Sequence, residues 1–127
     1  MNKVKNSLTL GFYFINLILI IFYLYPGSIF GCFLYNDCSI QPQITRDFII
    51  SSNHLYIFTI LSFLGIEVYK YTKKTKFLIL YLFLLSIILE LLHIIIPNRA
   101  FELSDLFGNI SGVILLIIIY KVKNKYV

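Results

Sequence analysis

FLILYLFLLSIILELLHIII, residues 77–96, is the stretch that decides the class of fold, because Glu90 and His93 are its only acidic or basic side chains. A helix that crosses a bilayer needs about 20 mostly apolar residues. The whole chain of 127 residues is 59% hydrophobic and 13% charged, with a mean hydropathy of +0.86. A soluble domain carries about 25% charged residues. We therefore expect an all-α membrane protein with the lipid bilayer as its main partner.

Three more apolar runs, residues 8–25, 48–69 and 104–120, are long enough to cross a membrane. Pro-Gly at 26–27 ends the first run, because proline cannot continue a helix. The sequence thus predicts a single domain over residues 1–127 with four transmembrane helices. The last two helices are expected to form a hairpin with a short loop.

The cations indicate how the chain is oriented in the membrane. The net charge is +5, and the two arginines, Arg46 and Arg99, lie in loops without lysine. Cytoplasmic flanks of membrane helices are rich in lysine and arginine. This pattern predicts cytoplasmic N- and C-termini, with the loops after the first and third helices outside. All lysines then fall inside, in three clusters: Lys3 and Lys5; Lys70, Lys73, Lys74 and Lys76; Lys121, Lys123 and Lys125.

The composition also bears on partners and location. Abundant Ile, Asn, Lys and Tyr are typical of an AT-rich, bacterial genome, so the cytoplasmic membrane of a bacterium is the expected location. A nucleic-acid role is not expected, because the chain offers no soluble basic surface interleaved with aromatic residues. The sequence does not indicate a protein partner.

Two cysteines, Cys32 and Cys38, share the first outer loop. On the oxidising side of a membrane they could form a disulfide that staples the loop. The alternative is a pair of free thiols. A C-x5-C spacing is not a redox or zinc signature, so no chemistry is expected from them.

Polar side chains concentrate near the outer ends of the last two helices. Glu90 and His93 stand three residues apart, and Asp105 and Asn109 stand four apart, so each pair lies on one helix face. Inserting an Asp at mid-span costs about 2.5–3.5 kcal/mol, which is why such residues usually mark a site. These residues therefore predict a site that faces the bundle.

Other positions of this hairpin suggest how the helices pack. Gly108 and Gly112 form a G-x-x-x-G pair, which allows two helices to approach closely. Ser86 and Pro97 extend the stripe of Glu90, and Pro97 is expected to pack between helices.

Arg99 is the only arginine near these residues, and it lies in the short loop of the hairpin. One interpretation is a buried ionic clasp, in which Arg99 pairs with Asp105 or Glu90. The other is an outward-facing polar pocket in which Arg99 binds an anion, because the planar guanidinium donates two parallel hydrogen bonds to phosphate or carboxylate. A clasp can also form the floor of such a pocket.

The spaced pattern of these residues resembles the signature of the VanZ-like family of small bacterial membrane proteins. The resemblance implies a four-helix membrane protein of the cell envelope. The founding member of that family is associated with low-level resistance to the antibiotic teicoplanin, so an effect on glycopeptide sensitivity is an expectation here. The pattern covers the last two helices and comprises Glu90, His93, Pro97, Arg99, Asp105, Asn109 and Gly112.

The first half of the chain matches the family less closely. Such proteins often start the second helix with Asp-Lys-x-x-His, whereas here Ile50 and Ser51 precede His54. His54 lies at the outer end of the second helix, at a depth that Glu90 could reach. We therefore include His54 among the candidate site residues.

The leading hypothesis is a protein that binds an anionic lipid-linked or cell-wall precursor headgroup. In this hypothesis Arg99 holds the anion, Asp105 and Asn109 orient Arg99, and Glu90 with His93 shapes the base of the pocket. Whether the protein is an enzyme stays open at this point.

Two further hypotheses remain. The first is an enzyme of lipid-carrier chemistry with Glu90 and His93 as acid and base. The second is a structural subunit whose G-x-x-x-G face binds a partner protein. No metal or other cofactor is expected, because only one Glu-x-x-His pair exists and Arg99 nearby would oppose a cation.

Overall fold

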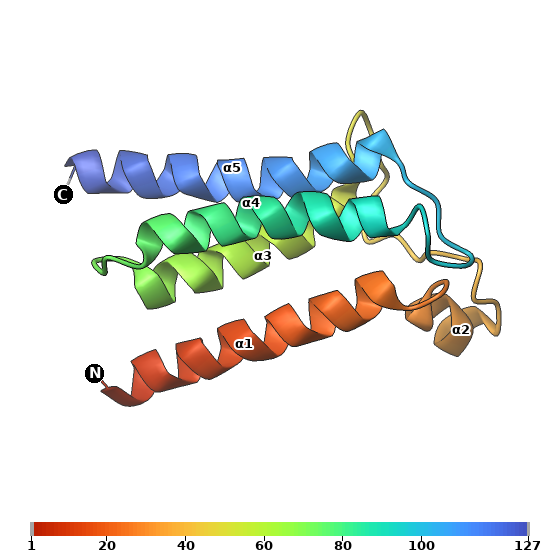
Figure 1. Cartoon of the computed structure of the whole chain (residues 1–127), viewed down its shortest axis with the longest axis horizontal. Coiled ribbons are helices and arrows are strands. Elements are labelled where there is room, and N and C mark those ends of the chain that lie inside the picture. Colours follow the sequence, from red (N-terminus) through yellow and green to blue (C-terminus); the bar gives the residue numbers. More distant parts are fainter. Residues whose placement is uncertain (1, 127) are drawn as a thin grey trace.

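Five helices and no strand make up residues 2–126, the part of the chain that the computed structural model describes (Figure 1). The all-α prediction is confirmed. Four of the helices lie side by side as a bundle, and the remaining short helix, α2, lies beyond one end of it (Figure 1). Their bounds are α1 (Asn2–Leu24), α2 (Ile29–Tyr35), α3 (Ser52–Tyr69), α4 (Thr75–Leu92) and α5 (Leu103–Tyr126).

The two ends of the bundle differ in what they carry. One end, termed the termini end, holds the start of α1, the end of α5 and the turn 70–74 between α3 and α4 (Figure 1). The other, termed the α2 end, holds α2 and the loop 93–102 between α4 and α5. Both α1 and α5 run past the predicted apolar runs, so the lysines near the two ends of the chain lie on helices.

Three of the helices, α1, α4 and α5, are long and apolar enough to cross a membrane, among the residues that the structure describes. At 18 residues α3 is as long as α4, but it starts with Ser52, Asn53 and His54, which lower its hydropathy. The apolar side chains that remain exposed cover the outside of the bundle, as they do on α1 at Leu10 and Phe14. Such a surface is suited to lipid.

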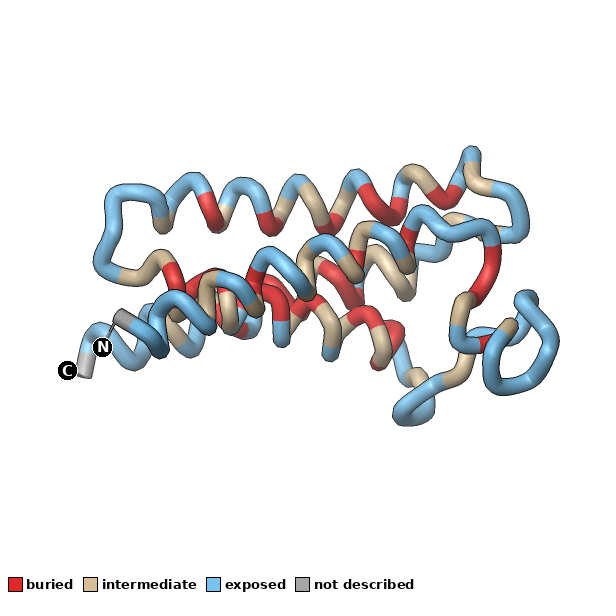
Figure 2. Tube along the Cα trace, turned by 90° about the horizontal axis from the view of Figure 1, so that it is seen from below, coloured by how far each residue is buried: buried red, intermediate tan, exposed pale blue. Residues whose placement is uncertain are grey.

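The core of the bundle is built around α3, which contacts α1, α4 and α5. Phe58 and Leu61 of α3 and Leu82 of α4 are fully buried. The buried residues follow the inward faces of the helices, and the outward faces are exposed (Figure 2). Because α3 lies centrally, polar groups at its first turn meet groups from every other long helix.

The glycine pair of α5 packs against α3. A Cβ atom at Gly112 would lie 2.7 Å from the carbonyl oxygen of Leu55, and one at Gly108 would lie 2.7 Å from that of Ser51. Only glycine therefore allows α5 to approach the backbone of α3 this closely. The face that the sequence analysis offered to a partner protein is occupied within the chain.

The end of α4 differs from the prediction. The helix ends at Leu92, and the amides of residues 93–95 bond to carbonyls three residues back, as in a 3₁₀ turn. Pro97 consequently lies exposed in the loop beyond the helix. The prediction that Pro97 packs between helices is therefore wrong, because the tighter turn carries the chain out of the bundle before Pro97 is reached.

The segment between α1 and α3 contains one element that the sequence analysis missed. Helix α2 begins after Ser28, whose hydroxyl accepts a hydrogen bond from the amide of Gly31 at 3.0 Å. It ends at Asn36, which adopts a left-handed conformation with φ of 52°. A disulfide joins Cys32 in α2 to Cys38 in the following loop. The disulfide thus fixes α2 to the loop that follows it.

Candidate functional site

Polar side chains from all four long helices meet at the α2 end of the bundle. The group is largely buried, and Glu90 and Asn109 are fully inaccessible. Each helix presents these residues where it enters or leaves the bundle, so the group closes the core at this end. It is termed the polar cluster and consists of Tyr23 of α1, His54 of α3, Glu90 of α4, His93 just after α4, and Asp105 and Asn109 of α5.

Asn109 is the centre of the polar cluster. Its Nδ2 donates to the carbonyl oxygen of Ser86 at 3.1 Å, which fixes the orientation of the amide. Its Oδ1 then accepts from the Tyr23 hydroxyl at 2.6 Å and lies 3.0 Å from Nδ1 of His54. Because an amide oxygen can only accept, the proton of His54 lies on Nδ1. Asn109 thereby joins α1, α3 and α4 to α5.

His93 is held between α1 and α4. Its Nε2 donates to the carbonyl oxygen of Tyr23 at 3.1 Å, and its Nδ1 lies 3.2 Å from Oε1 of Glu90. The ring also stacks on the Tyr23 ring, with centroids 5.4 Å apart. Both ring nitrogens are therefore engaged, which leaves neither poised to take a proton from a substrate. This arrangement does not favour the acid–base enzyme hypothesis.

The two oxygens of Glu90 have different surroundings. Oε1 accepts from the backbone amide of Glu102 at 3.2 Å and faces His93. Oε2 is buried and has no hydrogen-bond partner among the described residues. Its nearest ion-pair neighbour is Nδ1 of His54, at 3.9 Å. Glu90 thus points one unpaired oxygen toward His54.

Asp105 lies on the opposite side of His54 from Asn109. Its Oδ2 is 3.4 Å from Nε2 of His54. The residue belongs to the first turn of α5, where a negative charge is stabilised by the helix dipole. His54 is therefore placed between the carboxylates of Glu90 and Asp105.

Arg99 does not pair directly with either carboxylate. Its Nη2 donates to the carbonyl oxygen of Phe22 at 2.7 Å, and its Nε donates to that of Tyr25 at 3.3 Å. In a continuing helix the Phe22 carbonyl would accept from residue 26, but Pro26 has no N–H to donate. Arg99 fills this gap at the end of α1. The prediction that Asp105 and Asn109 orient Arg99 is wrong for this reason.

Burial and neighbouring charged or polar groups act on the pKa of Arg99 in opposite directions. Burial lowers the pKa of the guanidinium, while Tyr23, Glu90 and Asp105 act in the opposite direction. An arginine pKa lies so high that the group remains charged. Arg99 therefore brings a fixed positive charge to the α2 end.

A cavity of about 510 Å³ opens beside the polar cluster, between α1, α2, the segment 41–44 and α3. Arg99, His54 and His93 line it together with uncharged polar side chains, whereas Glu90, Asp105 and Asn109 do not. The uncharged polar residues are Tyr23, Ser28, Gln41, Gln43 and Asn53. The cavity thus combines one fixed positive charge, that of Arg99, with uncharged polar groups and apolar walls. Those walls include Ile18, Leu19, Phe22, Ile29, Phe30 and Ile57.

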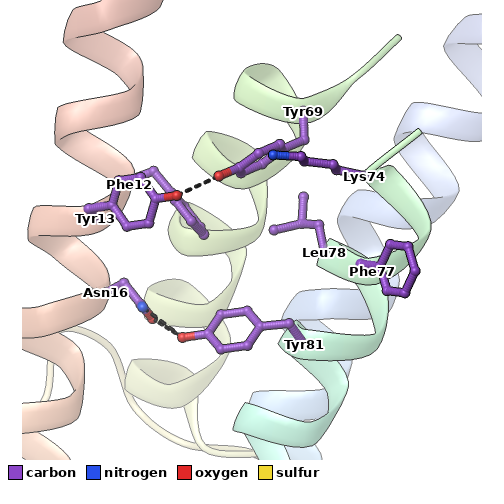
Figure 3. A pocket seen from close by; sticks show the side chains of 8 residues that line it. All are labelled: Phe12, Tyr13, Asn16, Tyr69, Lys74, Phe77, Leu78 and Tyr81. Carbon is purple, nitrogen blue, oxygen red and sulfur yellow. Dashed lines mark hydrogen bonds between the residues drawn. The ribbon is translucent and has the colours of Figure 1, made fainter. Parts of the chain in front are cut away.

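A second cavity of about 580 Å³ lies toward the termini end, between α1, α3 and α4 (Figure 3). Its polar groups form neutral pairs: Tyr13 with Tyr69, and Asn16 with Tyr81 (Figure 3). Among the described residues, Lys74 is the only charged side chain that lines it. This cavity lacks the acidic and histidine side chains of the α2 end.

The structure brings five of the six predicted site residues into one network, with Arg99 beside it on the cavity wall. Sequence reasoning missed Tyr23, which hydrogen-bonds Asn109 and whose hydroxyl lies 2.9 Å from His54. The ten tyrosines of the chain make any one of them inconspicuous. The sequence signal that could have identified Tyr23 is its position in the last turn of α1 before Pro26. Backbone carbonyls there lack a helical N–H donor and can bind other groups.

Apolar spanning helices around a buried ionisable cluster define a multi-pass helical membrane protein with a polar site at one end of the bundle. More specifically, the chain belongs to the VanZ/LLP1 family, whose model matches residues 10–124. The match confirms the resemblance noted in the sequence. No curated protein and no solved structure matches the chain.

Proposed function

We propose that this protein crosses the cytoplasmic membrane of a bacterium four times, with both termini in the cytoplasm, and binds an anionic headgroup from the outside. The fourth span in this proposal is α3, which equals α4 in length and contacts the other three long helices. Its polar first turn would lie within the polar cluster rather than in lipid. This arrangement removes the main objection to α3 as a span.

The charges support this orientation. Lysines gather at the termini end, on α1, on α5 and in the 70–74 turn. The two arginines lie in the loops at the α2 end. A cytoplasmic termini end satisfies the preference for positive residues inside, and the α2-end cavity then faces outward.

The observation that carries the proposal is the chemistry of the α2-end cavity. Arg99, His54 and His93 line it, together with apolar and uncharged polar side chains. The guanidinium has five N–H donors, of which two bind α1 carbonyls. The remaining donors suit a phosphate or carboxylate. A ligand with an anionic head and an apolar tail fits both parts of the cavity.

Such a ligand is found among anionic lipids and lipid-linked or cell-wall precursors. Membership of the VanZ/LLP1 family is consistent with a role at the cell envelope. In this proposal the protein influences glycopeptide sensitivity by holding such a precursor. The reaction, if any, would then belong to another protein.

A lipid-retention experiment tests the proposal. The protein is reconstituted with equal amounts of phosphatidylglycerol and phosphatidylcholine, and the lipids that remain bound are measured by native mass spectrometry. Losing a hydrogen bond to a charged group costs about 1.5–3 kcal/mol, so Arg99→Gln should weaken retention of the anionic lipid about 10- to 100-fold.

Arg46→Gln is the matched control, because Arg46 is the other arginine of the chain, is exposed and does not line the cavity. It should retain the anionic lipid as the wild type does. Equal retention by the wild type and Arg99→Gln would overturn the proposal. So would a wild-type preference for phosphatidylcholine.

A further inference from the structure

Three potential metal ligands from three helices converge inside the polar cluster. His54 of α3, Glu90 of α4 and Asp105 of α5 each place one ligand atom within 4.8 Å of the others. The side chains of Glu90 and His54 are buried, and that of Asp105 is mostly so. A histidine and two carboxylates are a ligand set for a divalent metal.

The tautomer of His54 suits a metal ligand. Asn109 accepts from Nδ1 of His54, so Nε2 is the ring nitrogen that faces Asp105, 3.4 Å away, and in the neutral imidazole it carries the lone pair. Metal-bound histidines almost always donate their other ring N–H to a carbonyl or carboxylate oxygen. Asn109 supplies that acceptor, and its own amide is fixed by the Ser86 carbonyl.

Glu90 provides an independent indication of a ligand. Its Oε2 is fully buried without a hydrogen-bond partner among the described residues. A buried, unpaired carboxylate oxygen is costly, so an unsatisfied one next to a histidine and an aspartate points to a positively charged group among them. The opposing charge expected from Arg99 is directed elsewhere, onto the carbonyls of Phe22 and Tyr25.

The spacing of His54 and Asp105 suits zinc. Ligand atoms about 2.0–2.2 Å from a tetrahedral zinc ion lie about 3.4 Å from one another, and His54 Nε2 and Asp105 Oδ2 are 3.4 Å apart. An ordinary N–H···O hydrogen bond is about 2.7–3.2 Å long. Zinc also matches the charge, because two carboxylates and a neutral imidazole together carry two negative charges.

We propose that His54, Glu90 and Asp105 hold a divalent cation of the zinc type, with Asn109 orienting His54. The sequence analysis expected no metal because it found a single Glu-x-x-His pair, Glu90 and His93, with Arg99 nearby. In the structure Nε2 of His93 is engaged by the carbonyl of Tyr23, and the histidine that faces the carboxylates is His54. The proposed metal does not depend on headgroup binding.

Metal content of the intact protein tests this proposal. The protein is purified in detergent with a tag free of histidine, stripped with a chelator and dialysed against micromolar Zn²⁺ or Mg²⁺. Retained metal is then measured by elemental mass spectrometry. We expect about one zinc ion per chain and no retained magnesium, because magnesium prefers an octahedral shell of oxygens.

Variants assign the ligands. His54→Gln and Asp105→Asn should lower zinc retention at least about 10-fold, whereas Glu102→Gln, an exposed acid nearby, should retain it. Arg99→Gln should also keep its zinc while losing the anionic lipid, so the two proposals fail separately. Zinc retained by His54→Gln would overturn the assignment.

A measurement on the wild type alone keeps the proposal testable if a variant fails to fold. X-ray absorption of the zinc-loaded protein should show a nitrogen ligand at about 2.0–2.1 Å beside oxygen ligands. A wild type that retains no zinc would mean that protons alone neutralise the cluster. That result, or an absorption spectrum with oxygen ligands only, would overturn the proposal.

Discussion

The α2 end and the termini end of the bundle both contain polar groups between helices, but they satisfy these groups in opposite ways. At the termini end, Tyr13 and Tyr69 pair through hydroxyls 2.6 Å apart, and Asn16 and Tyr81 pair with each other (Figure 3). Each pair is neutral, exposed and independent of the other. At the α2 end the groups are ionisable, buried and joined through Asn109.

The difference concerns what happens when one group is lost. A neutral, exposed pair leaves at most one hydroxyl or amide that can find water or a lipid headgroup. A member of the polar cluster leaves several buried partners unsatisfied at once, so the costs of the lost hydrogen bonds add up. Stability is therefore expected to depend strongly on the α2 end and weakly on the termini end.

The largest effect is expected from a glycine at the α2 end. In Gly112→Leu the new Cβ would lie 2.7 Å from the Leu55 carbonyl oxygen and 2.9 Å from Cβ of Phe58, so α5 must move away from α3. We expect a loss of about 3 kcal/mol, at the upper end of the range for overpacking. Gly11→Leu at the termini end is the control, because nothing lies within 4 Å of its Cβ position. Thermal unfolding in detergent measures both; similar melting temperatures would contradict the comparison.

A smaller effect is expected from the two asparagines. Asn109→Leu removes the acceptor of Tyr23 and His54 and the donor to the Ser86 carbonyl. Single hydrogen bonds between membrane helices contribute about 0.6 kcal/mol on average and up to about 1.7, so the combined loss is about 2 kcal/mol. Asn16→Leu loses only the exposed pair with Tyr81 and should cost less than about 0.5 kcal/mol. If Asn109→Leu and Asn16→Leu lowered the free energy of unfolding equally, the buried network would stabilise the protein no more than the exposed pair does.

The smallest effect is expected from single hydroxyls. Tyr23→Phe removes the donor to Asn109 but leaves the ring stacked on His93, so about 1 kcal/mol should be lost. In Tyr13→Phe the hydroxyl of Tyr69 loses an exposed partner, and the cost should be near zero. Amide hydrogen exchange at α5 distinguishes the two variants, since only Tyr23→Phe should raise it. Faster exchange in Tyr13→Phe would contradict the assignment of the termini end as the less critical region.

The sequence was sufficient for the all-α class and for the residues that gather at the α2 end, because ionisable groups in apolar runs are rare and therefore conspicuous. It did not identify the neighbours of those residues. Gly108 and Gly112 indicate a close approach but not which helix makes it. A pairing of Arg99 with a carboxylate was one of two interpretations. The sequence did not reveal the actual partner, because the consequence of Pro26 for the carbonyl of Phe22 depends on where the hairpin loop lies. Pro97 was misplaced because the 3₁₀ turn after Leu92 follows from the contact of His93 with α1.

The contact between Tyr23 and Asn109 also sets an order of events during biosynthesis. These residues lie 86 positions apart in the chain, so α1 emerges from the ribosome long before its hydrogen-bond acceptor does. Until α5 inserts, Tyr23 and His54 must rely on water or lipid headgroups. The site is thus completed only once α5 is in place, and a chain that stops before Asn109 would leave Tyr23 and His54 without this acceptor.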